Sequence, residues 1–306
     1  MKFSVTFPSV MYRDGPQSIT RLIRAIEDIG FHEMNVLDHV VMGYAVQGRD
    51  KPIYPAQMPL LEALSLLSYA AAVTERIGLA TGVLVLPQRQ AVLAAKQIST
   101  LDTLSGGRVR LGVGSGWQAS EYDALQENFS NRGRRMDEAI GLLRACWSAE
   151  RIDFRGEYYA LEAMAMEPKP PQGARIPVWI GGTVPRSLRR VAELGDGWMG
   201  MSFGFDADQT RRRVAHIHEH AESIGRDPAE IGLQMSLTPP RGMNPRDYYT
   251  NPAMMAEQAV SLRELGFNWG TINLVELFRA GYRSVNALTD QLTAIHEELS
   301  AAQLPD

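Results

Sequence analysis

Two kinds of hydrophobic pattern alternate along the whole chain. Short apolar runs of four to ten residues are typical of buried strands, and longer segments with apolar residues every three or four positions are typical of helices. The strand pattern occurs at 3–7, 34–37, 77–86, 108–113, 177–180, 197–201, 231–237 and 269–275. The helix pattern occurs at 16–29, 60–74, 92–104, 135–147, 186–194, 211–224, 254–265 and 285–299.

This alternation predicts the fold class. Eight strands that are each followed by a helix favour a closed parallel (β/α)8 TIM barrel over an open doubly wound sheet. A hairpin is predicted at 153–161, and the Pro/Gly-rich segment 239–252 directly follows a strand, so we expect an insertion at the barrel mouth. No linker divides the pattern, and we expect one domain over residues 1–306.

Composition narrows the class of protein. The 306 residues are 45% hydrophobic, which is enough for one large core. A formal net charge of −4 offers no field for nucleic acid or a membrane surface. Cys146 is the single cysteine and lies in a helical pattern, so we expect a buried thiol. The first residues lack the apolar region of a signal peptide, and we expect a cytoplasmic protein.

Asp38 and His39 follow the second predicted strand. Active sites of TIM barrels are built at the carboxyl ends of the strands. A histidine at such a place can give or take a proton near neutral pH, with Asp38 orienting the imidazole or bonding a coenzyme ring. The alternative is a capping aspartate beside a solvated histidine.

Residues 112–117 read GVGSGW and follow the fourth strand. Glycines at alternate positions let a ligand approach the backbone and leave amide groups free to donate. A dinucleotide-binding fingerprint needs its third glycine where Trp117 stands, which disfavours a Rossmann site. A tight packing turn is the alternative.

Gly181, Gly182 and Thr183 join the fifth strand to a helix. We expect Thr183 to be the N-cap and Pro185 to lie in the first turn. Free N–H groups and the helix dipole at such a terminus bind anions, and Arg186 could add positive charge. We favour a phosphate site here over a simple turn.

Other catalytic chemistries find no support in the sequence. His216, His218 and His220 alternate and therefore do not share one helix face, so we expect no metal site. The chain also lacks the Gly-x-Ser-x-Gly nucleophile elbow of many hydrolases.

Several motifs carry a family resemblance. They are LATGVLVLP, AKQISTLDTLSGGRVRLGVGSGW, the stretch 121–138 and PVWIGG…VAELGDGWM. The chain resembles the bacterial luciferase-like monooxygenase family over most of residues 1–200. Within that family it is most similar to the branch that uses the deazaflavin coenzyme F-420.

The resemblance implies specific site residues. His39 would be catalytic and lie beside the reactive ring. A strand bulge would carry a non-proline cis peptide at Gly82–Val83 and support the ring face. The residues implied in coenzyme binding are Asp38, Gly82, Val83, Gly114, Ser115, Gly116, Ser120, Gly181, Gly182 and Thr183.

Trp117 departs from one part of that branch. Sugar-phosphate dehydrogenases of the branch carry an acidic residue there, and tryptophan cannot transfer a proton in its place. Their lysine-based phosphate clamp also has no counterpart, so glucose-6-phosphate oxidation is not expected. Trp117 and Tyr44 are predicted to line a pocket for a less polar substrate, and Tyr12 and Tyr54 are further candidates.

The leading hypothesis is an oxidoreductase that transfers a hydride between carbon 5 of coenzyme F-420 and a small organic substrate. The alternative is a two-component FMN-dependent monooxygenase that a partner reductase supplies with reduced flavin. A barrel that binds a ligand without catalysis is a third. The resemblance also implies a homodimer, in which the apolar segment 60–74 would take part.

Overall fold

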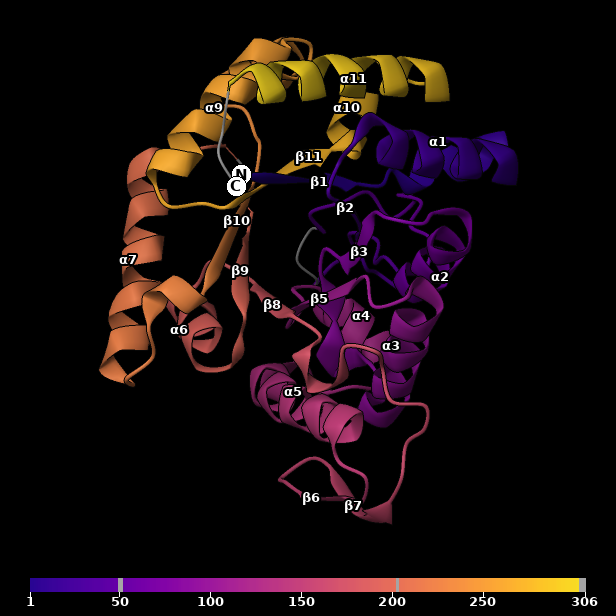
Figure 1. Cartoon of the computed structure of the whole chain (residues 1–306), viewed down its shortest axis with the longest axis vertical. Coiled ribbons are helices and arrows are strands. Elements are labelled where there is room, and N and C mark those ends of the chain that lie inside the picture. The colour runs from indigo at the N-terminus through magenta and orange to yellow at the C-terminus, as the bar shows by residue number, and fades with distance from the viewer. Residues whose placement is uncertain (49–51, 202–203, 303–306) are drawn as a thin grey trace.

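A parallel barrel organises the structure, a computed structural model that describes residues 1–48, 52–201 and 204–302. Its neighbouring strands follow the order of the chain, and the pairing of the third strand with the fourth closes the barrel. The helices form an outer ring in Figure 1. The strands are β1 (Lys2–Thr6), β2 (Glu33–Val36), β3 (Gly78–Thr81), β5 (Val109–Gly114), β8 (Val178–Gly181), β9 (Gly197–Gly200), β10 (Gly232–Ser236) and β11 (Trp269–Asn273). The predicted (β/α)8 TIM barrel is confirmed.

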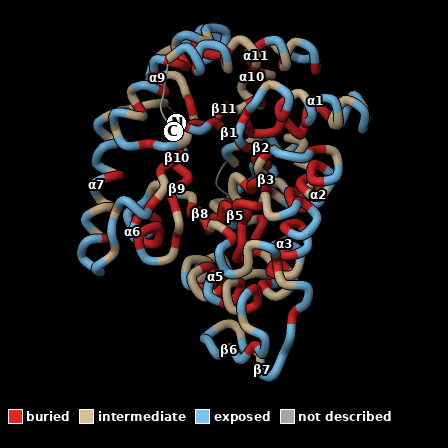
Figure 2. Tube along the Cα trace, in the orientation of Figure 1, coloured by how far each residue is buried: buried red, intermediate tan, exposed pale blue. Residues whose placement is uncertain are grey.

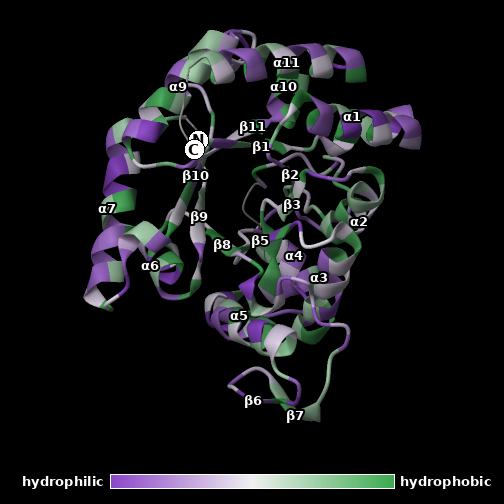
Figure 3. Cartoon of the chain, viewed as in Figure 1, coloured by the Kyte–Doolittle hydropathy of each residue, from purple (hydrophilic) through white to green (hydrophobic). Residues whose placement is uncertain are grey.

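The long helices agree with the predicted pattern. Pro16 opens the first of them, and Gly30 ends it in a left-handed conformation with φ of 105°. The helices of the outer ring are α1 (Pro16–Ile29), α2 (Ala63–Val73), α3 (Ala91–Ser105), α5 (Arg132–Ser148), α6 (Pro185–Leu194), α7 (Ala207–Ser223), α9 (Pro252–Glu264) and α11 (Val285–Ala301). Figures 2 and 3 show that these helices are buried and hydrophobic towards the strands and exposed and hydrophilic outside.

Shorter elements lie between the main ones. The predicted strand 77–86 is divided, because β4 (Leu84–Val85) is separated from β3 and pairs with β5. The predicted hairpin is β6 (Ile152–Arg155) with β7 (Ala160–Met164). Three short helices follow strand ends or lie in the 239–252 loop, namely α4 (Ala119–Ala124), α8 (Pro245–Tyr249) and α10 (Leu274–Ala280). The 3-10 helices are η1 (Ser9–Asp14), η2 (Leu86–Gln88), η3 (Phe129–Asn131), η4 (Gly173–Arg175) and η5 (Pro228–Glu230).

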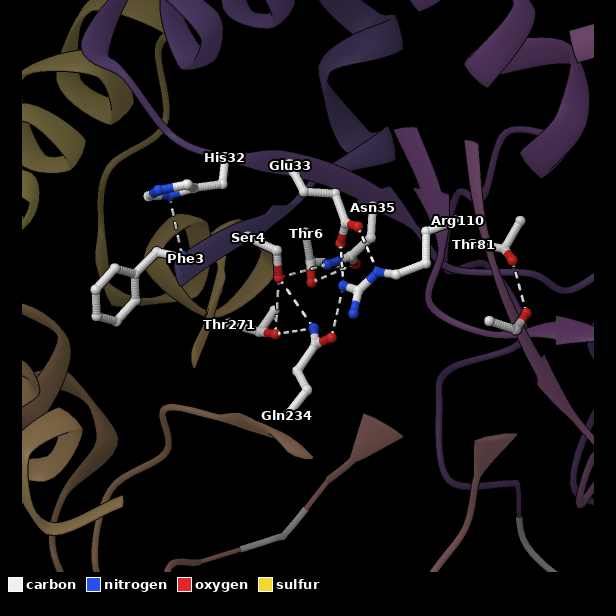
Figure 4. A network of polar contacts seen from close by, with 11 residues as sticks. Phe3, Ser4, Thr6, His32, Glu33, Asn35, Thr81, Arg110, Gln234 and Thr271 are labelled. Carbon is white, nitrogen blue, oxygen red and sulfur yellow. Dashed lines mark hydrogen bonds and ion pairs between the residues drawn. The ribbon is translucent and has the colours of Figure 1, made fainter. Parts of the chain in front are cut away.

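The inside of the barrel holds a polar network, which Figure 4 shows from close by. Arg110 of β5 donates two hydrogen bonds to Glu33 of β2, at 2.6 and 2.5 Å. The same guanidinium lies over the rings of both Trp179 and Trp269, 4.2 and 4.3 Å from their centroids. A buried ion pair needs such bidentate geometry and further contacts to offset its desolvation. This layer therefore forms a rigid polar floor under the barrel mouth.

The α2 helix bears on the homodimer expectation. Most of its apolar residues are buried within the chain, and the helix packs against α1 and α3. Its exposed positions include Ser65 and Tyr69, and the hydroxyl of Tyr69 hydrogen-bonds to Thr20 at 2.6 Å. Burial inside the subunit thus accounts for the apolar composition of 60–74. The homodimer remains a prediction from the family resemblance alone.

Cys146 is fully buried, as predicted, and burial raises the pKa of its thiol. A thiol in that state is a poor nucleophile at neutral pH. Among the described residues, no helix is long and apolar enough to cross a membrane.

Candidate active site

Asp38 lies buried at the carboxyl end of β2, and its carboxylate accepts hydrogen bonds from two residues of the chain. Its Oδ2 accepts a hydrogen bond from the backbone N–H of Val85 at 2.9 Å, and its Oδ1 accepts one from Arg89 Nη2 at 2.7 Å. Arg89 also pairs with Glu62 at 3.0 Å. Burial alone would lower the pKa of Arg89, but the two carboxylates raise it, so the guanidinium stays charged. Asp38 thereby fixes β4 beside the second strand.

His39 pairs with Glu121 of α4 rather than with its neighbour Asp38. Nδ1 of His39 lies 2.9 Å from Oε2 of Glu121, and Oε1 accepts hydrogen bonds from the backbone N–H groups of Val40 and Val41 at 2.6 and 3.3 Å. Burial would raise the pKa of Glu121, but the bonds from His39 and Val40 outweigh it and lower that pKa. The expectation that Asp38 orients the imidazole is therefore corrected, because Glu121 contacts it.

This pairing defines which imidazole atom can exchange a proton. An ionised carboxylate only accepts hydrogen bonds, so Nδ1 of His39 carries a hydrogen and donates it to Glu121. Nε2 is then the ring atom left to give or take a proton. A charged carboxylate beside the ring also stabilises the imidazolium form when it arises.

An aromatic wall surrounds the imidazole. The ring of Trp117 lies edge-on to His39 with 5.4 Å between centroids, and Tyr54 lies 6.0 Å from His39 and 6.1 Å from Trp117. Tyr44 is 61% exposed, and its hydroxyl accepts a hydrogen bond from Gln57 at 3.2 Å. Among the described residues, Tyr54 and Trp117 therefore form this wall, and the position of Tyr44 lends no support to its predicted pocket role.

Residues 82–83 separate β3 from β4 where the resemblance implied a bulge, and they are called the bulge. The peptide bond between Gly82 and Val83 is cis. The side chain of Val83 points towards two of the predicted coenzyme-binding glycines. A Cβ added at Gly114 would come within 2.6 Å of Val83, and one added at Gly181 would come within 3.1 Å. These two glycines make room for Val83, so intramolecular packing explains part of the glycine pattern.

Backbone conformation explains two other glycines. Gly116 and Gly182 have φ of 67° and 120°, values that other residues rarely adopt. A Cβ at Gly182 would also lie 2.8 Å from Oγ of Ser187. Ser115 lies within the GVGSGW turn and Ser120 shortly after it, and both are half-buried. The carbonyl of Ser115 accepts a hydrogen bond from Tyr122 at 2.8 Å.

The N-cap of the helix after β8 lies one residue later than predicted. Val184, not Thr183, is the N-cap of α6, and its side chain makes no capping hydrogen bond. Pro185 lies in the first turn, as predicted. No side chain caps this terminus, but Pro185 has no N–H and the N–H of Ser187 donates to the carbonyl of Val184 at 2.8 Å. Within residues 185–187 the N–H of Arg186 is therefore left for an anion, and the side chain of Arg186 is exposed beside it. The terminus therefore fits the predicted phosphate site.

A cavity of about 110 Å³ lies between residues 82–83 and the β8–α6 junction at the barrel mouth. The bulge residues Gly82 and Val83 line one side, and Gly181 and Gly182 line another. The polar network provides part of its lining through Thr6, Asn35, Gln234 and Thr271. The cavity therefore brings the bulge and the β8–α6 junction to one space, as a coenzyme site would require.

Sequence reasoning assigned no role to Glu121 or Arg89. The sequence signal for Glu121 was an acidic residue shortly after the GVGSGW motif. It opens the stretch 121–138, which was used only for the family resemblance. Arg89 carries no local signal, because its contact with Asp38 joins positions 51 apart. Among the described residues, no three His, Cys, Asp or Glu side chains gather as a metal site requires.

Comparison with known proteins finds relatives of this chain by sequence and by fold. An uncharacterised protein of Mycobacterium tuberculosis is 33% identical over 219 residues, covering 69% of this chain and 74% of that protein. The F-420-dependent glucose-6-phosphate dehydrogenase of the same organism is 27% identical over 258 residues, covering 81% of this chain and 73% of the dehydrogenase. The crystal structure of riboflavin lyase with modified FMN shares the fold, with a TM-score of 0.77, 14% identity and coverage of 100% and 92%.

One family model matches most of the chain. The model described as luciferase-like monooxygenase matches residues 1–240. The chain therefore belongs to the luciferase-like monooxygenase family, whose members are enzymes.

Proposed function

We propose that the protein is an F-420-dependent oxidoreductase that transfers a hydride between carbon 5 of the coenzyme and a small organic substrate. The observation that carries the proposal is the buried pair of His39 and Glu121 beside an aromatic wall. Reducing a carbonyl or an activated double bond needs a hydride and a proton, and His39 would give or take the proton. The F-420-dependent relative and the GVGSGW motif support this choice of coenzyme.

The residues of the mouth fit such a coenzyme. The N-terminus of α6 would hold the phosphate, with Gly181, Gly182 and Thr183 leading into it. The bulge at Gly82–Val83 would support one face of the ring. When bound, a deazaflavin supplies a two-electron hydride donor or acceptor. Asp38 would act indirectly, since its bonds to Val85 and Arg89 hold the segment that follows the bulge.

His39 and Glu121 would divide the work of proton transfer. Nε2 of His39 would give or take the proton as the hydride moves, and Glu121 would hold the imidazole by Nδ1. Trp117 and Tyr54 would keep water from the reacting atoms. Since Trp117 replaces the acidic residue of sugar-phosphate dehydrogenases, the proposed substrate is less polar than a sugar phosphate.

One observation favours a second candidate, a two-component FMN-dependent monooxygenase supplied by a partner reductase. Trp117 stands where sugar-phosphate dehydrogenases of the F-420 branch carry an acid that takes part in hydride chemistry. Such an enzyme would use the same bulge and the same phosphate terminus. Under either candidate we expect a cytoplasmic homodimer whose coenzyme another enzyme reduces.

Equilibrium binding to one coenzyme-free preparation separates the two candidates. We expect F-420 to bind at least about tenfold more tightly than FMN, a difference of ~1.4 kcal/mol. Isothermal titration of both coenzymes measures this ratio directly. Equal affinities, or tighter binding of FMN, would favour the monooxygenase.

A further inference from the structure

A larger pocket opens beside the coenzyme cavity. It has a volume of about 520 Å³ and lies between the 239–252 loop and the segment that carries Tyr54. Its described walls are mostly apolar and rich in methionine, a residue that adapts to irregular apolar shapes. The apolar residues that define it are Leu37, Tyr54, Met58, Met201, Met243 and Tyr249.

This substrate pocket continues in two directions. Leu37 and Met201 line both it and the 110 Å³ coenzyme cavity, so the two spaces adjoin. On the other side, Met58 and Val275 line both it and a third cavity of about 250 Å³. The third cavity is bounded by Val10, Pro59 and Phe278 among others. The three cavities therefore adjoin one after another, from residues 82–83 outwards.

Charge along these cavities is compensated where the structure describes it. Glu276 and Arg279, which line the substrate pocket, pair with each other at 2.8 Å. Arg241, the third charged residue of its described lining, lies 3.7 Å from Asp206. A bound ion would have to compete with these carboxylates for each arginine. The described walls therefore favour an uncharged ligand.

We propose that the substrate is a neutral, elongated apolar molecule that bears one carbonyl group. Its reactive end lies beside the coenzyme cavity, and its tail runs past Met58 and Val275 into the third cavity. The position of the reactive end rests on the proposed function. Binding of the tail does not, because it depends only on apolar walls outside the coenzyme cavity.

A homologous series of ketones tests the tail without any coenzyme. Titration calorimetry of the full chain with 2-alkanones from 2-hexanone to 2-dodecanone should show affinity rising about fourfold per methylene, equivalent to ~0.8 kcal/mol. Dodecanoate should bind at least about tenfold more weakly than 2-dodecanone. An affinity that is flat along the series, or a carboxylate that binds as well as the ketone, would overturn the proposal.

Two obstructing variants locate the tail. Val275→Phe narrows the junction between pockets, and Val10→Phe narrows the third cavity from the η1 side. In each variant the rise in affinity should stop at a shorter ketone, while Val260→Phe on the exposed side of α9 should keep the wild-type series. If an obstructing variant folds and its ketone affinities still rise with chain length as in the wild type, the proposed course of the tail is wrong. Since no coenzyme is present, failure here is distinct from failure of F-420 to bind more tightly than FMN.

Discussion

Glu121→Gln is the sharpest test of the proposed chemistry. The wild-type carboxylate is buried and accepts hydrogen bonds from His39 and from two backbone N–H groups. Glutamine keeps the shape, removes the charge and brings an NH₂ group that cannot accept a hydrogen bond. A hydrogen bond to a charged group contributes about 1.5–3 kcal/mol. If that interaction is used in the transition state, kcat should fall by roughly 10- to 150-fold.

Turnover of an artificial enone provides the assay. The protein would be supplied with reduced F-420 and 2-cyclohexen-1-one, and the formation of oxidised coenzyme would be followed by absorbance. We expect Glu121→Gln to lower kcat while coenzyme affinity changes little, because the phosphate terminus of α6 is untouched. His39→Ala should lower kcat by about 10²- to 10⁴-fold, since it removes the proton-transfer group itself.

Glu27 provides a matched control. It is also a buried carboxylate that accepts backbone hydrogen bonds, from Glu75, Arg76 and Ile77 at 3.0, 2.7 and 2.9 Å. Glu27→Gln should lower stability and leave kcat unchanged. If Glu121→Gln behaves in the same way, or if His39→Ala keeps near wild-type turnover, the pair is structural. Proton transfer would then fall to the substrate's own groups.

Three further predictions follow from other parts of the molecule. Val184→Asp should weaken F-420 binding by roughly tenfold, and Val184→Asn should not, because both side chains can cap α6 but only aspartate repels a phosphate. Equal affinities of the two variants in titration calorimetry would show that the phosphate does not bind at this terminus. Burial would raise the pKa of Glu27, but the hydrogen bonds from three backbone N–H groups outweigh it and lower that pKa below 4.5. The ionised carboxylate therefore makes its full contribution to the free energy of unfolding above pH 4.5, and this contribution is lost as the pH falls through the folded-state pKa. Glu27→Gln should therefore lower the free energy of unfolding by about 1–3 kcal/mol at pH 7, and the difference should narrow in acid melts; a constant difference would contradict the lowered pKa. Light scattering at micromolar concentration should give twice 33.9 kDa, and a monomer mass would contradict the homodimer.

The main elements were predictable because their signals are local. The α1 helix was predicted with its observed bounds, since Pro16 and Gly30 mark its two ends. The short helices α4, α8 and α10 were missed, because five to seven residues show too little periodicity to separate a helix from a turn. The N-cap of α6 was misplaced by one residue because a threonine is a better N-cap than the valine that occupies the position.

The site was only partly predictable because its contacts are long-range. The strand-end rule identified His39 and Trp117 as neighbours of the mouth, and the structure brings their rings to 5.4 Å. It could not pair His39 with Glu121, since the two are 82 positions apart and a carboxylate next in sequence was the simpler partner. Only the closed barrel brings the end of β2 and the turn after β5 together.

The two sides of the barrel mouth differ in how their side chains are held. Asn35 accepts a hydrogen bond from Thr6 at 2.8 Å, and a Cβ at Gly82 would come within 2.6 Å of its Oδ1. The bulge therefore lies directly against a side chain that the network of Figure 4 holds in place. Buried networks of this kind specify one arrangement, because an unpaired polar group costs more than a displaced apolar one. The methionine-rich substrate pocket has no such constraint, so variation in substrate should be accommodated there and not at the bulge.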